Sequence, residues 1–256
     1  MHAILIVKLR TLMFSRIYKY HHELNSYDVV KFLAIITMVI DHIGFYFVVE
    51  NTEYWRTIGR FAAPLFFFMS GYVSKYHIKP NILFYGIFIT VAGFILGYGF
   101  SINILIVIVC IKWVLEHWDP SQENVVTLVI IFALLYFFSF LLIGVIDYGL
   151  FGFAYAFCGR LLAMKANQVL VSSFLFGTLY SQLYDLIIFN ENLYVATEAL
   201  IVTIILLFLM ALFKYKVFFI KSLFKNGILI FSRYSLEIYF WHLLLFEIVF
   251  QLRRFF

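Results

Sequence analysis

The stretch VVKFLAIITMVIDHIGFYFVV, from Val29 to Val49, decides how the rest of the chain is interpreted. It is long and apolar enough to cross the hydrocarbon core of a bilayer as one α-helix, which takes about 20 residues. Two neighbouring ionisable residues, Asp41 and His42, lie in its second half. Each ionisable side chain in hydrocarbon costs at least about 2.5–3.5 kcal/mol. An imidazole beside a carboxylate is a common general-base arrangement, so the pair favours an enzyme over a passive membrane protein.

The composition of the chain requires a bilayer as its solvent. Of the 256 residues, 64% are hydrophobic and 13% are charged, whereas soluble domains contain about 45–50% apolar and about 25% charged residues. Three prolines and the absence of a Gly/Ser-rich linker predict a single integral membrane domain over residues 1–256. Residues 1–26 carry basic residues at intervals along an apolar run, which predicts an amphipathic segment on the inner membrane surface rather than a signal peptide.

Windows of about 20 apolar residues predict an all-α polytopic protein with about nine transmembrane helices, in a range of about eight to ten. The predicted spans are 28–50, 57–76, 81–98, 100–116, 125–144, 146–165, 168–189, 193–213 and 226–250. The chain shows no internal repeat, and this disfavours an inverted-repeat transporter.

The basic residues predict the orientation of these helices in the plasma (inner) membrane, because lysine and arginine concentrate on the cytoplasmic side. With a cytoplasmic N-terminus and an external C-terminus, the outer side receives only Arg56, Arg60, Arg253 and Arg254. The inner side receives fourteen basic residues: Lys8, Arg10, Arg16, Lys19, Lys31, Lys75, Lys79, Lys112, Arg160, Lys165, Lys214, Lys216, Lys221 and Lys225. The net charge of +5 therefore reflects topology, and no nucleic-acid partner is expected, because no basic stripe is interleaved with exposed aromatics.

This orientation brings one set of polar residues towards the outer half of the membrane. At about 1.5 Å per residue, His42 lies about 21 Å from the inner face, and His242 lies at a similar depth in the last helix. We expect them to face a cavity open to the outside, together with Arg60, Asp147, Asp185 and Glu198. Two simpler interpretations remain open: Arg60 can neutralise Asp41, and His242 can serve as a helix–helix hydrogen bonder.

A second set of polar residues lies near the inner face. Lys31, Arg160 and Arg233 lie inside helices or at their ends, where cations can bind the phosphates of a cytosolic donor. The alternative for such cations is topology and snorkelling. Cys110 and Cys158 lie in apolar segments and are expected to be buried free thiols, and no metal site is expected.

The first helix resembles a known family of membrane enzymes. The segment YDVVKFLAIITMVIDH, from Tyr27 to His42, is similar to the first helix of the acyltransferase type 3 superfamily. There an Asp is followed by a basic residue three positions on and by a His eleven further on. Asp28, Lys31 and His42 match this spacing, but Lys31 stands where the family usually has Arg. The ammonium of lysine is a point charge, whereas the planar guanidinium of arginine can form two parallel hydrogen bonds. The Asp-His doublet followed by Ile-Gly is closer to the related TraX family of conjugative-pilin N-acetyltransferases.

Two further segments carry the same resemblance. GRFAAPLFFFMSGY, from Gly59 to Tyr72, is similar to the second helix of both groups. SRYSLEIYFWHLLLF, from Ser232 to Phe246, is similar to the last conserved helix, whose SLxIYxxH pattern ends here at His242. The three segments together cover under a fifth of the chain, but they occur in the family's order.

The resemblance implies an acetyl transfer across the membrane. Acetyl-CoA would be the donor substrate on the cytosolic side, with Lys31, Arg233 and Arg160 as its candidate contacts. His42 would deprotonate an acceptor amine or hydroxyl in the outer half, with Asp41 as orienter of the ring or as charge partner of Arg60. The residues implied for oxyanion or acceptor binding are Arg60, Ser70, Tyr239 and His242. An acyl-His intermediate is an alternative to direct transfer.

The resemblance leaves the acceptor and the assembly open. A pilin-like protein N-terminus, an envelope glycan and a lipid all offer a suitable amine or hydroxyl, and an oligomer is compatible with the sequence. One rival hypothesis is a proton-coupled transporter or flippase that uses Asp41, His42 and Arg60 as a relay. Another is a noncatalytic subunit of a membrane assembly. Binding of CoA would discriminate the enzyme from the transporter.

Overall fold

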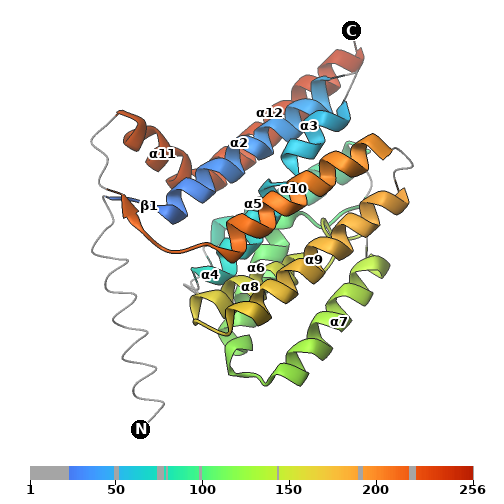
Figure 1. The fold of residues 1–256 in the computed structure, drawn as a ribbon. Coiled ribbons are helices and arrows are strands. Elements are labelled where there is room, and N and C mark those ends of the chain that lie inside the picture. The colour runs from blue at the N-terminus through green and yellow to red at the C-terminus, as the bar shows by residue number, and fades with distance from the viewer. Residues whose placement is uncertain are drawn as a thin grey trace.

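The computed structural model describes residues 23–48, 52–73, 78, 80–97, 100–142, 144–189, 193–218 and 223–255. Residues 1–22, which make up most of the predicted interfacial segment, lie outside the described residues. The described helices are α2 (Ser26–Phe47), α3 (Thr52–Gly59), α4 (Ala62–Tyr72), α5 (Pro80–Ile95), α6 (Ile104–His117), α7 (Val125–Leu142), α8 (Phe151–Ala163), α9 (Gln168–Phe189), α10 (Leu193–Ala211), α11 (Leu223–Arg233) and α12 (Ser235–Phe255), with a 3-10 turn at Pro120–Gln122 (Figure 1). The strands β1 (Leu24–Asn25) and β2 (Val217–Phe218) form one short antiparallel pair.

The fold is all-α apart from this strand pair, as the sequence predicts, but two predicted spans are each divided into two helices. The predicted span 57–76 is interrupted at Arg60 and Phe61, between α3 and α4. The predicted span 226–250 is interrupted at Tyr234, between α11 and α12. Hydropathy alone does not reveal such breaks, because one or two polar residues inside a long apolar run leave the average over the window apolar.

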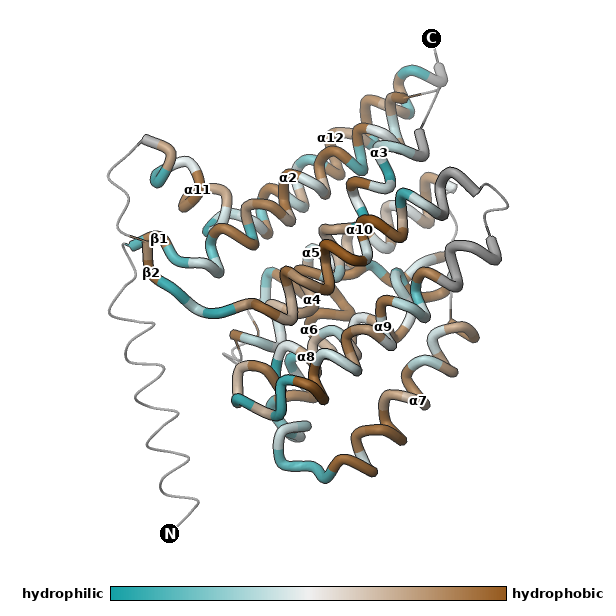
Figure 2. The backbone as a smooth tube through the Cα atoms, viewed as in Figure 1, coloured by the Kyte–Doolittle hydropathy of each residue, from teal (hydrophilic) through white to brown (hydrophobic). Residues whose placement is uncertain are grey.

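Three helical segments among the described residues are long and apolar enough to cross a membrane: Ser26–Phe47, Val125–Leu142 and Ser235–Arg253. Shorter apolar helices occupy Pro80–Ile95, Phe151–Ala163 and Thr197–Ala211. Hydrophobic residues run along the helices in Figure 2, whereas hydrophilic residues gather in connections such as those before α7 and before β2. Multiple apolar helices of this kind indicate an integral membrane protein.

The helix α8 forms the centre of the bundle and packs most closely against α4. Glycines permit this approach on both helices. A Cβ atom at Gly71 would lie 1.8 Å from the carbonyl oxygen of Ala156, and one at Gly159 would lie 2.1 Å from that of Phe68. Small residues at a helix crossing let two backbones come this close. The packed pair of helices α4 and α8 therefore provides a fixed core against which the other helices pack.

The helices α2 and α12 lie side by side and run in the same direction (Figure 1). Near the start of both, the Ser232 hydroxyl donates to the Asp28 carboxylate at 2.6 Å. Near the end of α2, the Tyr46 hydroxyl lies 3.5 Å from the carboxylate of Glu247, which is in the second half of α12. His42 and His242 each lie about one helical turn before these two residues, so the parallel packing of the helices brings the two histidines to the same height.

Candidate active site

The structure joins His42 of α2 and His242 of α12. The Nδ1 atom of His42 lies 2.7 Å from the Nε2 atom of His242, within hydrogen-bond distance. The two rings are stacked, with centroids 4.9 Å apart and an interplanar angle of 27°. Two histidines that are 200 positions apart in the sequence thus form one unit.

The hydrogen bonds of this pair determine where its protons lie. The second ring nitrogen of His242, Nδ1, lies 2.7 Å from the backbone carbonyl oxygen of Ile238. A carbonyl only accepts, so Nδ1 carries a hydrogen, and Nε2 of a neutral His242 is an acceptor. His42 therefore donates through Nδ1, and its Nε2 atom keeps a lone pair. The reverse direction of the bond would require His242 to be an imidazolium. His42 Nε2 is thus arranged as the basic atom of the pair.

Asp41 does not occupy the position that the sequence assigns to it as orienter of the His42 ring. Its carboxylate lies 3.9 Å from the Nε atom of Arg56 in α3, and it makes no hydrogen bond to His42 among the described residues. Successive residues of a helix do not face each other, so the side chains of Asp41 and His42 leave α2 in different directions. A Cβ atom at Gly59 would lie only 2.1 Å from the Cβ of Asp41. Asp41 therefore faces α3, and His242 is the partner of the His42 ring.

Arg60 lies at the turn between α3 and α4, close enough to Asp41 and Arg56 for their charges to act on it. The expected pairing with Asp41 is not a direct contact, because Arg56 takes that carboxylate. The Nε atom of Arg60 is buried and has no hydrogen-bond partner among the described residues. An unsatisfied buried donor costs about 1–3 kcal/mol, and more for a charged group. Arg56, which the sequence interpretation counts only as an outer charge, is thus part of this cluster.

Tyr239 flanks both histidines, with ring centroids 6.4 Å from His42 and 5.9 Å from His242. Its hydroxyl oxygen accepts a 2.8 Å hydrogen bond from the side-chain amide of Asn103. The oxygen of that amide caps helix α6 by accepting from the backbone of Leu105, which fixes which end of the amide faces Tyr239. The Tyr239 O–H hydrogen is left to donate. Asn103 was missed at the sequence level, although an Asn directly before an apolar run is an N-cap signal.

The remaining outer candidates are less closely connected to the histidine pair. The Ser70 hydroxyl donates to the Phe66 carbonyl one turn earlier, at 2.8 Å. Asp147, in the connection between α7 and α8, accepts a 2.5 Å hydrogen bond from Ser101. Burial raises the pKa of Asp147, and the Ser101 hydrogen bond opposes this rise. Glu198 is half-buried in α10, and the side chain of Asp185 lies outside the described residues.

The three predicted donor-binding cations lie in two different places. The Lys31 ammonium donates to the backbone carbonyl of Ser232 at 2.6 Å, and the exposed Arg233 is the next residue. Arg160 of α8 is instead only 3% exposed and pairs with both carboxylate oxygens of Asp119. This ion pair fastens the connection between α6 and α7 to the central helix. Lys31 and Arg233 therefore share a junction that Arg160 does not join.

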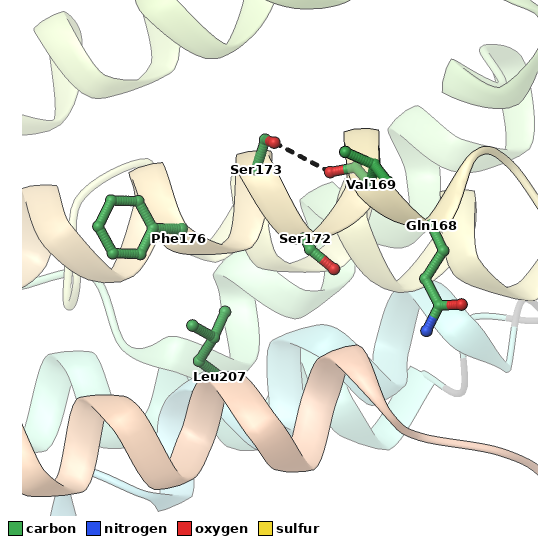
Figure 3. Close-up of a pocket in the computed structure, with 6 residues that line it drawn as sticks. All are labelled: Gln168, Val169, Ser172, Ser173, Phe176 and Leu207. Atoms are coloured by element: carbon green, nitrogen blue, oxygen red, sulfur yellow. Dashed lines mark hydrogen bonds between the residues drawn. The ribbon is translucent and has the colours of Figure 1, made fainter.

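A surface groove lies away from these groups. A groove of about 580 Å³ runs between α9 and α10 (Figure 3), where the Ser173 hydroxyl bonds to the Val169 carbonyl at 2.9 Å. Its lining contains none of the predicted site residues. No group of three or more His, Cys, Asp or Glu side chains in the described part of the chain is arranged to hold a metal ion.

Comparison with known proteins identifies the enzyme class. Residues 24–88 match the acyltransferase domain family, and this region contains Asp28, Lys31, His42 and Arg60. The uncharacterized protein RP591 of Rickettsia prowazekii (strain Madrid E) is 30% identical over 203 residues, which cover 73% of this chain and 80% of that protein. No solved structure matches the chain. The chain therefore belongs to the same family as the Rickettsia protein, and its acyltransferase domain makes it a membrane-bound acyltransferase.

Proposed function

We propose that the protein transfers an acetyl group from cytosolic acetyl-CoA to an acceptor amine or hydroxyl in the outer half of the membrane, with His42 as the general base. The observation that supports this proposal is the hydrogen-bonded histidine pair. His242 is anchored to the Ile238 carbonyl and accepts from His42, which leaves the lone pair on His42 Nε2. The match to the acyltransferase domain includes His42.

The chemical step follows from this arrangement. The nitrogen or oxygen of the acceptor attacks the acetyl carbonyl carbon, and His42 Nε2 takes the acceptor's proton. The carbonyl oxygen becomes an oxyanion, to which the Tyr239 hydroxyl donates. When the tetrahedral intermediate collapses, the carbon–sulfur bond breaks and the CoA sulfur leaves with the electron pair, to be protonated by His42. His242 stabilises the charged His42 because its Nε2 lone pair faces the Nδ1 hydrogen.

The donor side of the proposal uses the junction between α2 and α11. Lys31 and Arg233 lie there together, at the cytosolic ends of their helices in the proposed orientation. We leave Arg160 out of the donor site, since both Asp119 oxygens already occupy its guanidinium. The acceptor remains a pilin-like protein N-terminus, as in the TraX family, or an envelope glycan or lipid.

Transfer of labelled acetyl groups tests the proposal. Membranes that contain the protein are incubated with [14C-acetyl]-CoA, and the label is counted in the protein, glycan and lipid fractions. A general base contributes about 10²–10⁴-fold to rate, so His42→Ala should lose that much transfer while the purified variant stays folded and binds acetyl-CoA. Full transfer by a well-folded His42→Ala variant would rule out His42 as the base. Proton-driven solute uptake without acetyl transfer would instead support the transporter.

A further inference from the structure

A narrow cavity lies on the side of Arg60 that faces α9 and α10. Its volume is about 10 Å³, which is room for about one water molecule. The polar side chains that line it are Arg60 from the α3–α4 turn, Gln182 from α9 and Thr203 from α10. The other lining residues are apolar, so these three side chains decide what the cavity can hold.

All three polar groups can donate hydrogen bonds, and the amide oxygen of Gln182 already accepts one from another residue. The buried Nε of Arg60 has no partner among the described residues. The Tyr155 hydroxyl donates to the side-chain oxygen of Gln182, so that amide presents its NH₂ group as the remaining polar end. The Thr203 hydroxyl makes no hydrogen bond within the described part of the chain. A cation, an amide NH₂ and a hydroxyl around one space are a donor set for an oxyanion.

The charges around the cavity point to the same kind of ligand. Asp41 is the nearby carboxylate that acts on Arg60, but its oxygen faces Arg56. The guanidinium groups of Arg56 and Arg60 thus share the single negative charge of Asp41. The phenol of Tyr148 is neutral and adds no further negative charge. A cation beside the buried Leu179 and Leu183 needs a counter-charge, since apolar surroundings disfavour an unpaired ion.

We propose that Arg60, Gln182 and Thr203 form a subsite for one oxygen atom of an anionic group, a phosphate or a carboxylate, carried by the acetyl acceptor. The assignment to the acceptor rests on the proposed acyl transfer at His42, because Gly59, the residue before Arg60, packs directly against Asp41, the residue next to that histidine. The small volume admits a single oxygen and leaves the rest of the group outside. The acceptor is therefore an anionic molecule rather than a neutral sugar.

Binding of simple anions to the full-length protein tests the subsite without any acetyl transfer. In one arm, thermal unfolding in neutral detergent is measured with sodium phosphate against sodium chloride at equal ionic strength. In the other arm, phosphatidylglycerol is compared with phosphatidylcholine in mixed micelles, which separates a lipid headgroup from a free anion. We expect an upward shift of about 2 °C or more in at least one arm. The shift should vanish in Arg60→Gln and persist in Arg253→Gln, which removes the same charge at the exposed end of α12, over Phe47.

A second variant separates the subsite from a purely structural role of Arg60. Gln182→Glu places a carboxylate at the cavity and supplies the acceptor that Arg60 lacks, so it should raise the melting temperature without anion and abolish the anion-induced shift. Equal shifts in wild type and Arg60→Gln, or no shift in either arm, would overturn the subsite. Loss of acetyl transfer in His42→Ala is measured separately, so the two proposals can fail independently.

Discussion

A histidine that accepts through Nε2, as His242 does, can be replaced in part by another acceptor at the same place. The chain of hydrogen bonds runs from His42 Nδ1 to His242 Nε2 and from His242 Nδ1 to the Ile238 carbonyl. The role of His242 is to hold the His42 ring and to stabilise its cation, so it acts through His42 and does not itself touch the reacting atoms.

We therefore expect His242→Gln, whose side-chain oxygen can still accept from His42, to retain more acetyl transfer than His242→Leu, which cannot. Both variants should keep their KM for acetyl-CoA and lose kcat. The pH profile of kcat should shift more in His242→Leu, because the cation of His42 loses its partner. Equal activity of the two variants would show that hydrogen bonding by His242 does not matter to the reaction.

Lys31 and Arg233, the candidate donor-binding cations at the junction between α2 and α11, give a second prediction at the scale of residues. Lys31→Ala and Arg233→Ala should each weaken acetyl-CoA binding by about 1.5–3 kcal/mol, the worth of a charge-assisted hydrogen bond. Calorimetry with CoA on the purified variants measures this. Arg160 is paired internally, so the CoA phosphates should not depend on it. Unchanged affinity in both folded variants would place the phosphates elsewhere.

At the scale of elements, the contact between α2 and α3 positions the outer polar cluster. The Cβ of a residue at Gly44 would lie 2.3 Å from the Cβ of Trp55, and one at Gly59 would lie 2.1 Å from that of Asp41. Neither contact leaves room for a methyl group. The two glycines thus set the distance at which Asp41 meets Arg56 and at which the α3–α4 turn presents Arg60.

Gly59→Ala should force α3 away from α2, lower the melting temperature and reduce acetyl transfer. The matched control is Gly93→Ala in α5, where an added Cβ meets nothing within 4 Å. Alanine is favoured over glycine inside a helix by about 0.5–1 kcal/mol, so the control should be neutral or slightly stabilising. Similar melting temperatures for the two variants would contradict the close packing at Gly59.

The ion pair between Asp119 and Arg160 joins the α6–α7 connection to α8 and gives a pH-dependent prediction. Burial alone would raise the pKa of Asp119, but hydrogen bonds from Arg160 and Ser121 and the charge of Arg160 together hold it below its usual value. A carboxylate with a lowered folded-state pKa stabilises the fold above its unfolded pKa of about 3.9, and this stabilisation is lost as the pH falls through the folded value.

Asp119→Asn should therefore lower stability at pH 7, by on the order of 1.5–3 kcal/mol for a hydrogen bond to a charged group. The difference from wild type should begin to shrink below about pH 4, where Asp119 of the unfolded chain takes up its proton, and should be lost as the pH falls through the lower pKa of the folded state. Thermal unfolding at a series of pH values measures both effects. A difference that stays constant down to pH 3 would mean that the charge of Asp119 contributes nothing.

Hydrophobic windows could predict where helices occur in this chain, because burial in a bilayer imposes long apolar runs. They could not predict the breaks at Arg60 and Tyr234, which depend on packing against other helices. The sequence likewise singled out His42 and His242 individually, since ionisable residues inside apolar runs are rare. Their direct bond, and the turning of Asp41 towards Arg56, depend on the side-by-side placement of α2, α3 and α12, which no local pattern encodes.

At the scale of the whole molecule, the fold relates the positions of distant segments to the two sides of the membrane. The backbone of Ser26 bonds to the carbonyl of Lys216 at 2.8 Å, and β1 pairs with β2. The start of α2 and the segment before α11 therefore lie on the same side. The helix α12 runs parallel to α2 and carries the C-terminus to the opposite side (Figure 1). The geometry fixes relative sides only, and the positive-inside rule selects which side is cytoplasmic.

We expect a reporter fused after Phe256 to be external and one fused after Lys216 to be cytoplasmic. Alkaline phosphatase, active only outside, and green fluorescent protein, fluorescent only inside, measure this as a complementary pair. Two fusions on the same side would contradict the parallel arrangement of α2 and α12. Two fusions on opposite sides but in the reverse order would keep the fold and invert the orientation. In that case Lys31 and Arg233 would face outwards, and cytosolic acetyl-CoA would have to bind near Arg60 instead.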